Sequence, residues 1–215
     1  MIRRGADATA RSSPVGDLEA IPLIARNSVT ESRIGFMLTT LQVRFLRLCA
    51  KEGVRYVVVG GQAMRARGLD RATRDLDILL SPLVRDAEAL LRALGAIDDR
   101  LPKSVPVSML TSPLRRISIP DADGITIDLL TSIEAIDFEQ AYGRASTLRL
   151  DGCPCTVASV DELITAKRAS RARCLARASD PGLAAHMVEA YTELASRDAL
   201  DVTLLEELAL GGPAL

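Results

Sequence analysis

The chain has 215 residues, 48% of them hydrophobic and 3% aromatic, with 27 basic and 28 acidic side chains. This length suits one ordinary domain with accessory segments, or two small domains. Bulk charge gives no argument for a nucleic-acid partner, because the two signs nearly cancel. No apolar run approaches the ~18 residues of a membrane span, and no apolar segment follows Arg3 and Arg4. We therefore expect a cytoplasmic protein with no membrane partner.

The four cysteines do not form a metal-binding pattern. They include no C-x-x-C pair, and the chain has a single His. Zinc sites usually need closely spaced Cys and His ligands, so a zinc site is not expected. We predict buried or half-buried thiols in a reducing compartment for Cys49, Cys153, Cys155 and Cys174.

Residues 1–28 show no clear amphipathic pattern, and we expect a flexible N-terminal arm there. Apolar periodicity and Gly or Pro punctuation predict the elements that follow. In chain order they are a helix within 31–52 ended by Gly53, a strand over 54–59, a helix over 62–67 stopped by Gly68, a strand over 74–80, a helix over 83–96, strands over 105–110, 114–120 and 124–132, a helix over 133–145, a hairpin over 147–158, and helices from the N-cap Ser159 to about Leu210, divided at Pro181.

Strands separated by helices and then by hairpin-like connections imply an α/β (α+β) fold with a mixed sheet. We expect an α/β core over 29–158, flanked by helices, and a helical C-terminal region over 159–215.

Acidic residues interrupt two strands that otherwise look buried. Asp75 and Asp77 are two residues apart in "RDLDILL", and Asp128 lies within "GITIDLLT". Side chains at i and i+2 of a strand share a face, and two close carboxylates repel one another. If the two strands are neighbours, the three acids can form a cluster that suits two divalent cations about 4 Å apart. Because the acids repel, we expect Asp75→Asn and Asp128→Asn to leave folding intact or improve it.

A glycine pair, Gly60 and Gly61, lies where the strand over 54–59 turns into a helix. Without a Cβ, this backbone can approach a phosphate and present its N–H groups. Gln62 could add a side-chain donor. Four arginines lie between this turn and the acids, and they could help to hold a triphosphate: Arg65, Arg67, Arg71 and Arg74.

Each feature also has a purely structural interpretation. A glycine pair after a strand is usually just a turn, and "DLD" on an edge strand could be a solvated face. Asp128 could pair with Arg115 or Arg116. The three features together, in this order and each within predicted strands, favour a functional origin.

The stretch "VVVGGQAMRARGLDRATRDLDILL" resembles the signature of the DNA polymerase beta-like nucleotidyltransferase superfamily, in which Gly-Gly or Gly-Ser precedes an Asp-x-Asp strand. "RATRDLD" and the hairpin and helix that end in "DELITAKRAS" are similar to its small bacterial branch, which includes the AbiEii-type toxins. Many members have Ser where Gly61 stands, and Gly is an accepted variant there. Their later Arg-Pro-Lys-Asp-like run has only a loose counterpart here, at Arg177 and Asp180.

The resemblance implies a nucleotidyltransferase-like fold and roles for individual residues. Asp75, Asp77 and Asp128 would be metal ligands for two Mg²⁺ ions, with Mn²⁺ as a substitute, and Asp128 would also be the general base. The nucleotide-binding residues would be Gly60, Gly61, Gln62, Arg67, Arg74 and Lys167.

The implied reaction moves a nucleoside monophosphate from an NTP to a hydroxyl on tRNA, on a protein or on a small molecule, and a toxin-like member would have a cognate antitoxin. Basic residues on the helix after Ser159 could hold RNA phosphates, or could simply form a solvated face: Lys167, Arg168, Arg171, Arg173 and Arg177. The other two readings are a non-catalytic binding module of this fold and an unrelated α/β protein with structural acids.

Overall fold

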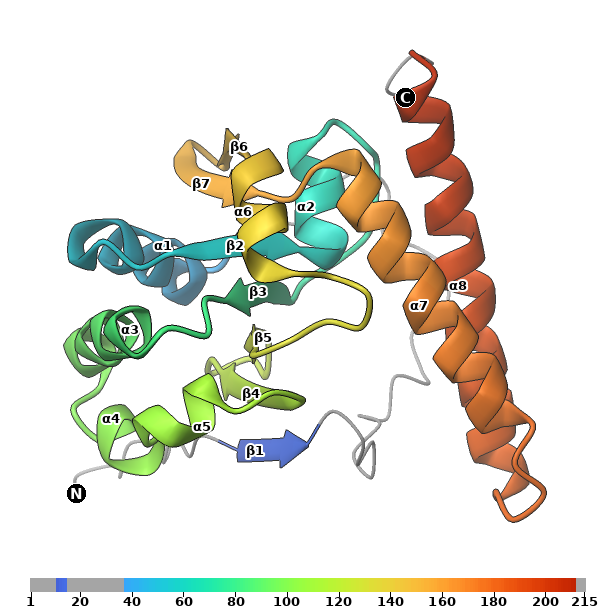
Figure 1. The fold of residues 1–215 in the computed structure, drawn as a ribbon, viewed down its shortest axis with the longest axis horizontal. Helices are drawn as coiled ribbons and strands as arrows, with labels where there is room; N and C mark the ends of the chain where they lie inside the picture. The colour runs from blue at the N-terminus through green and yellow to red at the C-terminus, as the bar shows by residue number, and fades with distance from the viewer. Residues whose placement is uncertain (1–10, 15–36, 212–215) are drawn as a thin grey trace.

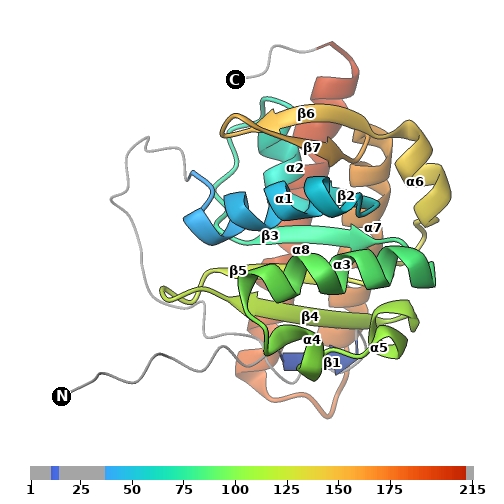
Figure 2. The ribbon, with the colours of Figure 1, turned by 90° about the vertical axis from the view of Figure 1, so that its left-hand side faces the viewer.

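A computed structural model describes residues 11–14 and 37–211. It confirms the α/β class, with a mixed sheet and a helical C-terminal region. Helices α1 (Thr40–Glu52) and α3 (Val84–Ile97) lie on one side of the sheet, and α7 (Val160–Ala178) and α8 (Ala185–Ala209) lie on the other (Figures 1 and 2). Neither these helices nor any other helix in the described ranges is long and apolar enough to cross a membrane.

The sheet has seven strands in the order β1-β4-β5-β3-β2-β7-β6. Their bounds are β1 Arg11–Pro14, β2 Tyr56–Val59, β3 Leu76–Leu80, β4 Arg115–Pro120, β5 Thr126–Leu130, β6 Ser146–Leu150 and β7 Cys153–Val157. β3 pairs in parallel with β5, and β2 with β7, while the other neighbours are antiparallel. This order puts the strand with Asp77 next to the strand with Asp128.

The centre of the sheet is buried on both faces, as the β-branched run before the glycine pair predicts. All four residues of β2 are buried. Leu76 and Ile78 of β3 and Ile127 and Leu129 of β5 are fully buried. With so few aromatic residues, aliphatic side chains supply most of the hydrophobic stabilisation.

Local sequence sets the helix ends. Thr39 caps α1 in a capping box with Gln42, and Gly53 ends it in the left-handed conformation at φ 68°. Ser159 caps α7 as expected, its hydroxyl accepting from the Glu162 N–H. The remaining helices are α2 Gly60–Ala66, α4 Leu101–Ser104, α5 Val107–Thr111 and α6 Phe138–Arg144.

The two C-terminal helices pack on one another and on the rest of the molecule. Leu163 of α7 and Leu205 of α8 belong to the main core cluster. Farther along the pair, Cys174, Tyr191 and Ala195 form a second small apolar cluster. α8 is therefore joined to the core at its C-terminal half and to α7 along the rest of its length.

Three expected elements differ from the structure. The expected strand over 105–110 is helical, because a short apolar run after Pro106 fits α5 as well as a strand, and its Leu110 still reaches the core. α1 begins at Thr40, since Thr39 acts as its N-cap, and Met37 is 72% exposed. α8 begins at Ala185, beyond Pro181.

Within the expected N-terminal arm, Arg11–Pro14 forms β1 and pairs with β4. The rest of that arm, and Ile34 in the first predicted helix, lie outside the described residues. All four cysteines are buried free thiols, as predicted.

Candidate functional site

The glycine pair and the acids meet at one end of the β2–β3 pair. β2 ends at Val59, the chain turns through Gly60 into α2, and it returns antiparallel as β3, so that Val59 pairs with Asp77. On the other side of β3, Asp77 pairs with Asp128 of β5. Paired residues of neighbouring strands point to the same face of a sheet, so the two carboxylates lie side by side on one face. The predicted convergence of Asp77 and Asp128 is therefore present.

Gly60 is required by this convergence. Its φ is +65°, and a Cβ built on it would lie 2.1 Å from Oδ2 of Asp77. The Asp77 carboxylate thus rests against the backbone of the turn, where a side chain at residue 60 would exclude it. The glycine pair and the Asp-x-Asp segment therefore form one structural unit. The 13 residues Gln62–Arg74 separate them in the sequence.

Asp128 is fully buried and hydrogen-bonded on both oxygens. Oδ2 accepts from the Arg116 guanidinium at 2.5 Å and from the Thr126 hydroxyl at 3.1 Å, and Oδ1 accepts from the Ser118 hydroxyl at 2.5 Å. Ser118 of β4 is the register partner of Asp128, and Arg116 lies two residues before it, on the same face. The structural alternative that paired Asp128 with an arginine is therefore also present, through Arg116.

Asp75 precedes β3 and is half-buried. Its Oδ1 accepts from the backbone N–H of Thr126 at 2.8 Å, a side-chain bond next to the first residue pair of β3 and β5. Its charge still acts on Asp77 and Arg116. The three acids thus share one region, and one oxygen of Asp75 is already engaged.

Asp77 has the least satisfied carboxylate of the three. No hydrogen bond reaches its side chain from the described residues, and the group is half-buried. Burial, and then repulsion from Asp128, raise the pKa of Asp77 to about 7, although Arg116 and Lys167 partly offset them. At neutral pH this carboxyl is therefore partly protonated, and a cation placed beside it would favour its ionised form.

The second glycine is constrained by a neighbour that sequence reasoning missed. A Cβ on Gly61 would lie 2.7 Å from both Cβ and Oγ1 of Thr73, so Thr73 packs directly on the turn. Gln62 is fully buried, accepts from Arg65 at 2.9 Å, and leaves its Nε2 without a hydrogen-bond partner. A serine at position 61 would collide with Thr73, which explains why glycine stands there.

The predicted nucleotide-binding arginines differ in their surroundings. Arg67 donates to the carbonyls of Ala158 at 2.6 Å and Val157 at 3.3 Å, and burial lowers its pKa. It ties α2 to the end of β7. The Arg74 side chain is exposed and, among the described residues, makes no ion pair, so it is the arginine available to a ligand.

Lys167 lies between the acids and α8. Its charge partly offsets the rise in the pKa of Asp77, but its Nζ forms ion pairs with Asp198 at 2.8 Å and Asp201 at 2.7 Å. Burial opposes the charged form of Lys167, yet these two carboxylates outweigh it and raise the lysine pKa. Asp201 also accepts from Arg71 at 2.6 Å.

Asp198 and Asp201 were not singled out from the sequence. The available signal was their spacing in "RDALD", which puts two acids on the inward stripe of α8 that also carries Ala195 and Leu205. Asp180 instead lies exposed in the turn between α7 and α8, where it accepts from the Gly182 N–H at 2.9 Å.

The basic residues of α7 do not form one free face. Arg168 pairs with Glu206 at 2.5 Å and Arg173 with Glu134 at 3.4 Å, and Arg177 also has a partner. Arg171 is exposed. Most of this charge is neutralised within the chain, which reduces its value for binding RNA phosphates.

The site offers the oxygen ligands that a hard divalent cation prefers, but these ligands do not form a complete coordination site. In the ranges that the structure covers, no three His, Cys, Asp or Glu side chains gather closely enough to hold a metal ion. Carboxylates of Asp77 and Asp128 at one level of the sheet are ligands that Mg²⁺ or Mn²⁺ accepts. A cation there would have to share Asp128 with Arg116.

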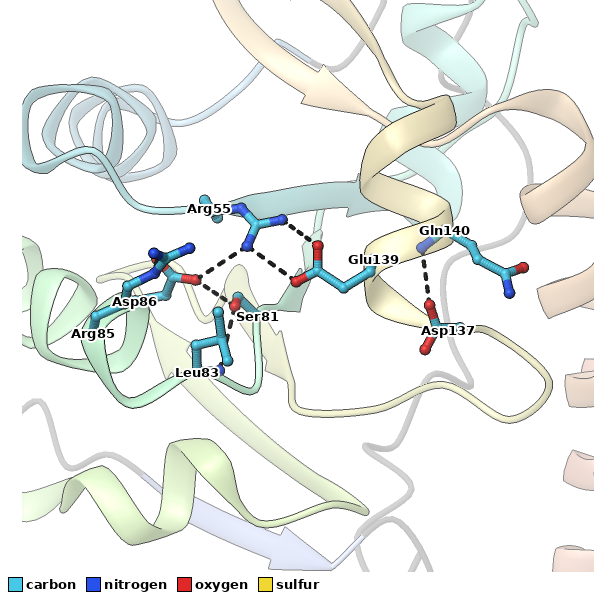
Figure 3. A network of polar contacts seen from close by, with 8 residues as sticks. All are labelled: Arg55, Ser81, Leu83, Arg85, Asp86, Asp137, Glu139 and Gln140. Atoms are coloured by element: carbon cyan, nitrogen blue, oxygen red, sulfur yellow. Dashed lines mark hydrogen bonds and ion pairs between the residues drawn. The ribbon is translucent and has the colours of Figure 1, made fainter.

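A second charged cluster lies at the opposite end of the β2–β3 pair (Figure 3). Arg55 pairs with Glu139 at 2.6 Å and Asp86 at 3.8 Å, and its guanidinium stacks over Phe138 and Tyr142. Asp86 also accepts from the buried Ser81 hydroxyl. Asp86 and Glu139 each have a cationic partner, and these contacts join β2 to α3 and α6 as a structural cluster.

No protein-family model matches the chain, and no curated protein matches it either.

Proposed function

We propose that this chain is a metal-dependent nucleotidyltransferase that moves a nucleoside monophosphate from an NTP to an acceptor hydroxyl and releases pyrophosphate. One observation carries the proposal: Asp77 and Asp128 are register partners on parallel strands, and Asp77 rests against Gly60 of the strand–helix turn. A sheet gains nothing in stability from two adjacent carboxylates, whereas a cation bound to phosphates would be held by them.

Each group has a defined task in this proposal. The acceptor oxygen forms a bond to the α-phosphorus, the bond from that phosphorus to the bridging oxygen of the β-phosphate breaks, and Asp128 takes the hydroxyl proton. Asp75, Asp77 and Asp128 would hold two Mg²⁺ ions, or Mn²⁺, which neutralise phosphate charge. Gly60, Gly61 and Gln62 would lie along the triphosphate, with Arg74, Lys167 and Arg67 on its outer side.

The acceptor would be a hydroxyl on tRNA, on a protein or on a small molecule, in the cytoplasm. A tRNA acceptor would make the chain toxin-like and would call for a cognate antitoxin. The exposed Arg171 and Arg74 are the cations that favour a polyanionic acceptor, because most other arginines near the site are paired within the chain.

A non-catalytic binding module of the same fold is the second candidate. The hydrogen bonds on both oxygens of Asp128 favour it, since Arg116, Ser118 and Thr126 occupy three of the roughly four acceptor sites of this carboxylate and stabilise its ionised form, which makes it a weaker base. Such a module would bind an NTP and leave it intact.

The test is label transfer from each NTP, labelled at the α-phosphate, with Mg²⁺ and either total RNA or lysate protein as acceptor. We expect covalent label in one acceptor fraction and equimolar pyrophosphate. Asp77→Asn should abolish both products, while Asp99→Asn, which changes an exposed acid paired with Lys103, should retain them.

The two candidates give different results in this assay. NTP binding without label transfer in any fraction would support the binding module. Neither binding nor transfer would exclude both and leave the acids with a structural role.

A further inference from the structure

Among the described residues, Arg116 is the cation in direct contact with an acid of the candidate site, Asp128. Its Nη2 lies 2.5 Å from Oδ2 of Asp128, and Asp75 and Asp77 act on it through space as well. Lys167 is nearby but is bound to Asp198 and Asp201. Against three carboxylates, Arg116 therefore supplies one positive charge, at the oxygens that a divalent cation would use.

The position of Arg116 allows its guanidinium to move away from Asp128. Its side chain is 42% exposed although its partner Asp128 is fully buried, and it extends from β4 on a long unbranched stem. Its Nε is buried without a hydrogen-bond partner. A buried donor without a partner carries a free-energy cost, so this position satisfies the guanidinium only in part.

Removing Arg116 from Asp128 without a replacement would leave a buried carboxylate uncompensated. The remaining partners, Ser118 and Thr126, are neutral hydroxyls. A doubly charged cation would compensate Asp128 better than Arg116 does, because it can also neutralise Asp77, which no hydrogen bond from the described residues reaches.

We propose that Arg116 is a positioning residue that acts through Asp128: it holds the carboxylate in place and competes with a divalent cation for the Oδ2 atom. This inference rests on the proposed function and adds a residue on which the affinity of the site for metal depends. Loading of the site with a cation would then require the guanidinium to turn outward from β4.

The test measures Mn²⁺ binding from the electron paramagnetic resonance signal of the free ion. It compares wild type with Arg116→Met, Arg116→Lys and Arg115→Met. Loss of the competing charge should tighten Mn²⁺ binding about tenfold in Arg116→Met. Arg116→Lys keeps the charge and should stay near wild type. Arg115→Met is the matched control, since Arg115 is on the same strand and points to the opposite face.

Thermal unfolding gives a readout that does not depend on activity. In the presence of a chelator, Arg116→Met should melt below wild type because Asp128 loses its counter-ion, and added Mn²⁺ should raise its melting temperature more than that of wild type. If Arg116→Met does not fold, Arg116→Gln removes the charge and keeps a donor for Asp128.

The outcomes separate this inference from the proposed function. Wild-type binding of Mn²⁺ with equal or weaker binding by the neutral variants would overturn the role of Arg116 and leave the nucleotidyltransferase proposal standing. If neither wild type nor any variant binds Mn²⁺ with an NTP present, the chain has no metal site of this kind. That result would refute both proposals.

Discussion

The β2–β3 pair carries a charged cluster at each end, and the two differ in how their charges are balanced. Around Arg55, the acids Asp86 and Glu139 are balanced by two arginines, since Arg85 also pairs with Asp86 at 3.7 Å. Two aromatic rings and a serine hydroxyl complete this cluster, and its outer acid, Glu139, is exposed to solvent (Figure 3). Around Asp77, three acids share Arg116, and Asp77 is left without a hydrogen bond from the described residues. The first cluster stabilises the fold, whereas the second leaves the burial of Asp77 and its repulsion from Asp128 only partly offset within the described residues.

The largest expected effect is that of Gly60→Ala. The new Cβ would meet the Asp77 carboxylate and would occupy a positive φ, so we expect a loss of about 3 kcal/mol in the free energy of unfolding. Gly152→Ala is the control, because Gly152 also has a positive φ but nothing within 4 Å of its Cβ position. That variant should lose about 1 kcal/mol in urea denaturation. Equal losses would mean that Asp77 does not press on the turn.

Asp86→Asn tests the structural cluster. Asp86 is buried and joins Arg55 to Ser81, so removal of its charge should cost about 2 kcal/mol in urea denaturation. NTP binding and label transfer should not change at a temperature where the variant is folded. Loss of transfer by the folded variant would show that the two ends of the β2–β3 pair are coupled.

Asp77→Asn should stabilise the protein, and only at high pH. Folding raises the pKa of Asp77 from 3.8 to about 7, so the folded state favours the protonated acid. The stability that this carboxyl contributes is complete below pH 4 and is lost as the pH rises through 7. With a chelator present, we expect a gain of about 1–2 kcal/mol at pH 8 and none at pH 4. If the gain in stability were the same at pH 4 and pH 8, the ionisation of Asp77 could not be its cause.

The smallest expected effect is that of Glu139→Gln. Its ion pair with Arg55 is short, 2.6 Å, but Glu139 is largely exposed, and water and salt screen such pairs. The melting temperature should fall by less than about 2 °C. A larger fall would mean that the cluster depends on Glu139 as much as on the buried Asp86.

The sequence predicted the parts of this molecule that depend on local pattern. Periodicity and residues with one strong preference predict the buried β2, the glycine turn, β3 with Asp77, the hairpin at Gly152 and the Ser159 cap. α5 was mistaken for a strand because five apolar and small residues fit either period.

Contacts between distant segments could not be predicted in the same way. Asp128→Asn was predicted to leave folding intact or improve it, but the pattern did not reveal that Arg116, Ser118 and Thr126 donate to this carboxylate. Nor did it reveal that Asp77, which Asp128 repels, receives no hydrogen bond from the described residues. Lys167 was expected at a phosphate, and nothing local in α7 indicated that Asp198 and Asp201 would reach it. The hydrogen-bond and ion-pair partners of such residues depend on how strands and helices are placed in space. The pattern of charges along the sequence does not determine that placement.

The packing of α8 determines how this protein can be cut for experiments. Leu205 lies in the same apolar cluster as Phe45 of α1 and Ile78 of β3, although more than a hundred positions separate it from either. A shortened version that stops after Ala158 would lose Leu163 and Leu205 from that cluster and would open it to water. Deletion of the last two helices would therefore destabilise the sheet along with its acids, so experiments at Asp77 should be made on a chain that keeps α7 and α8.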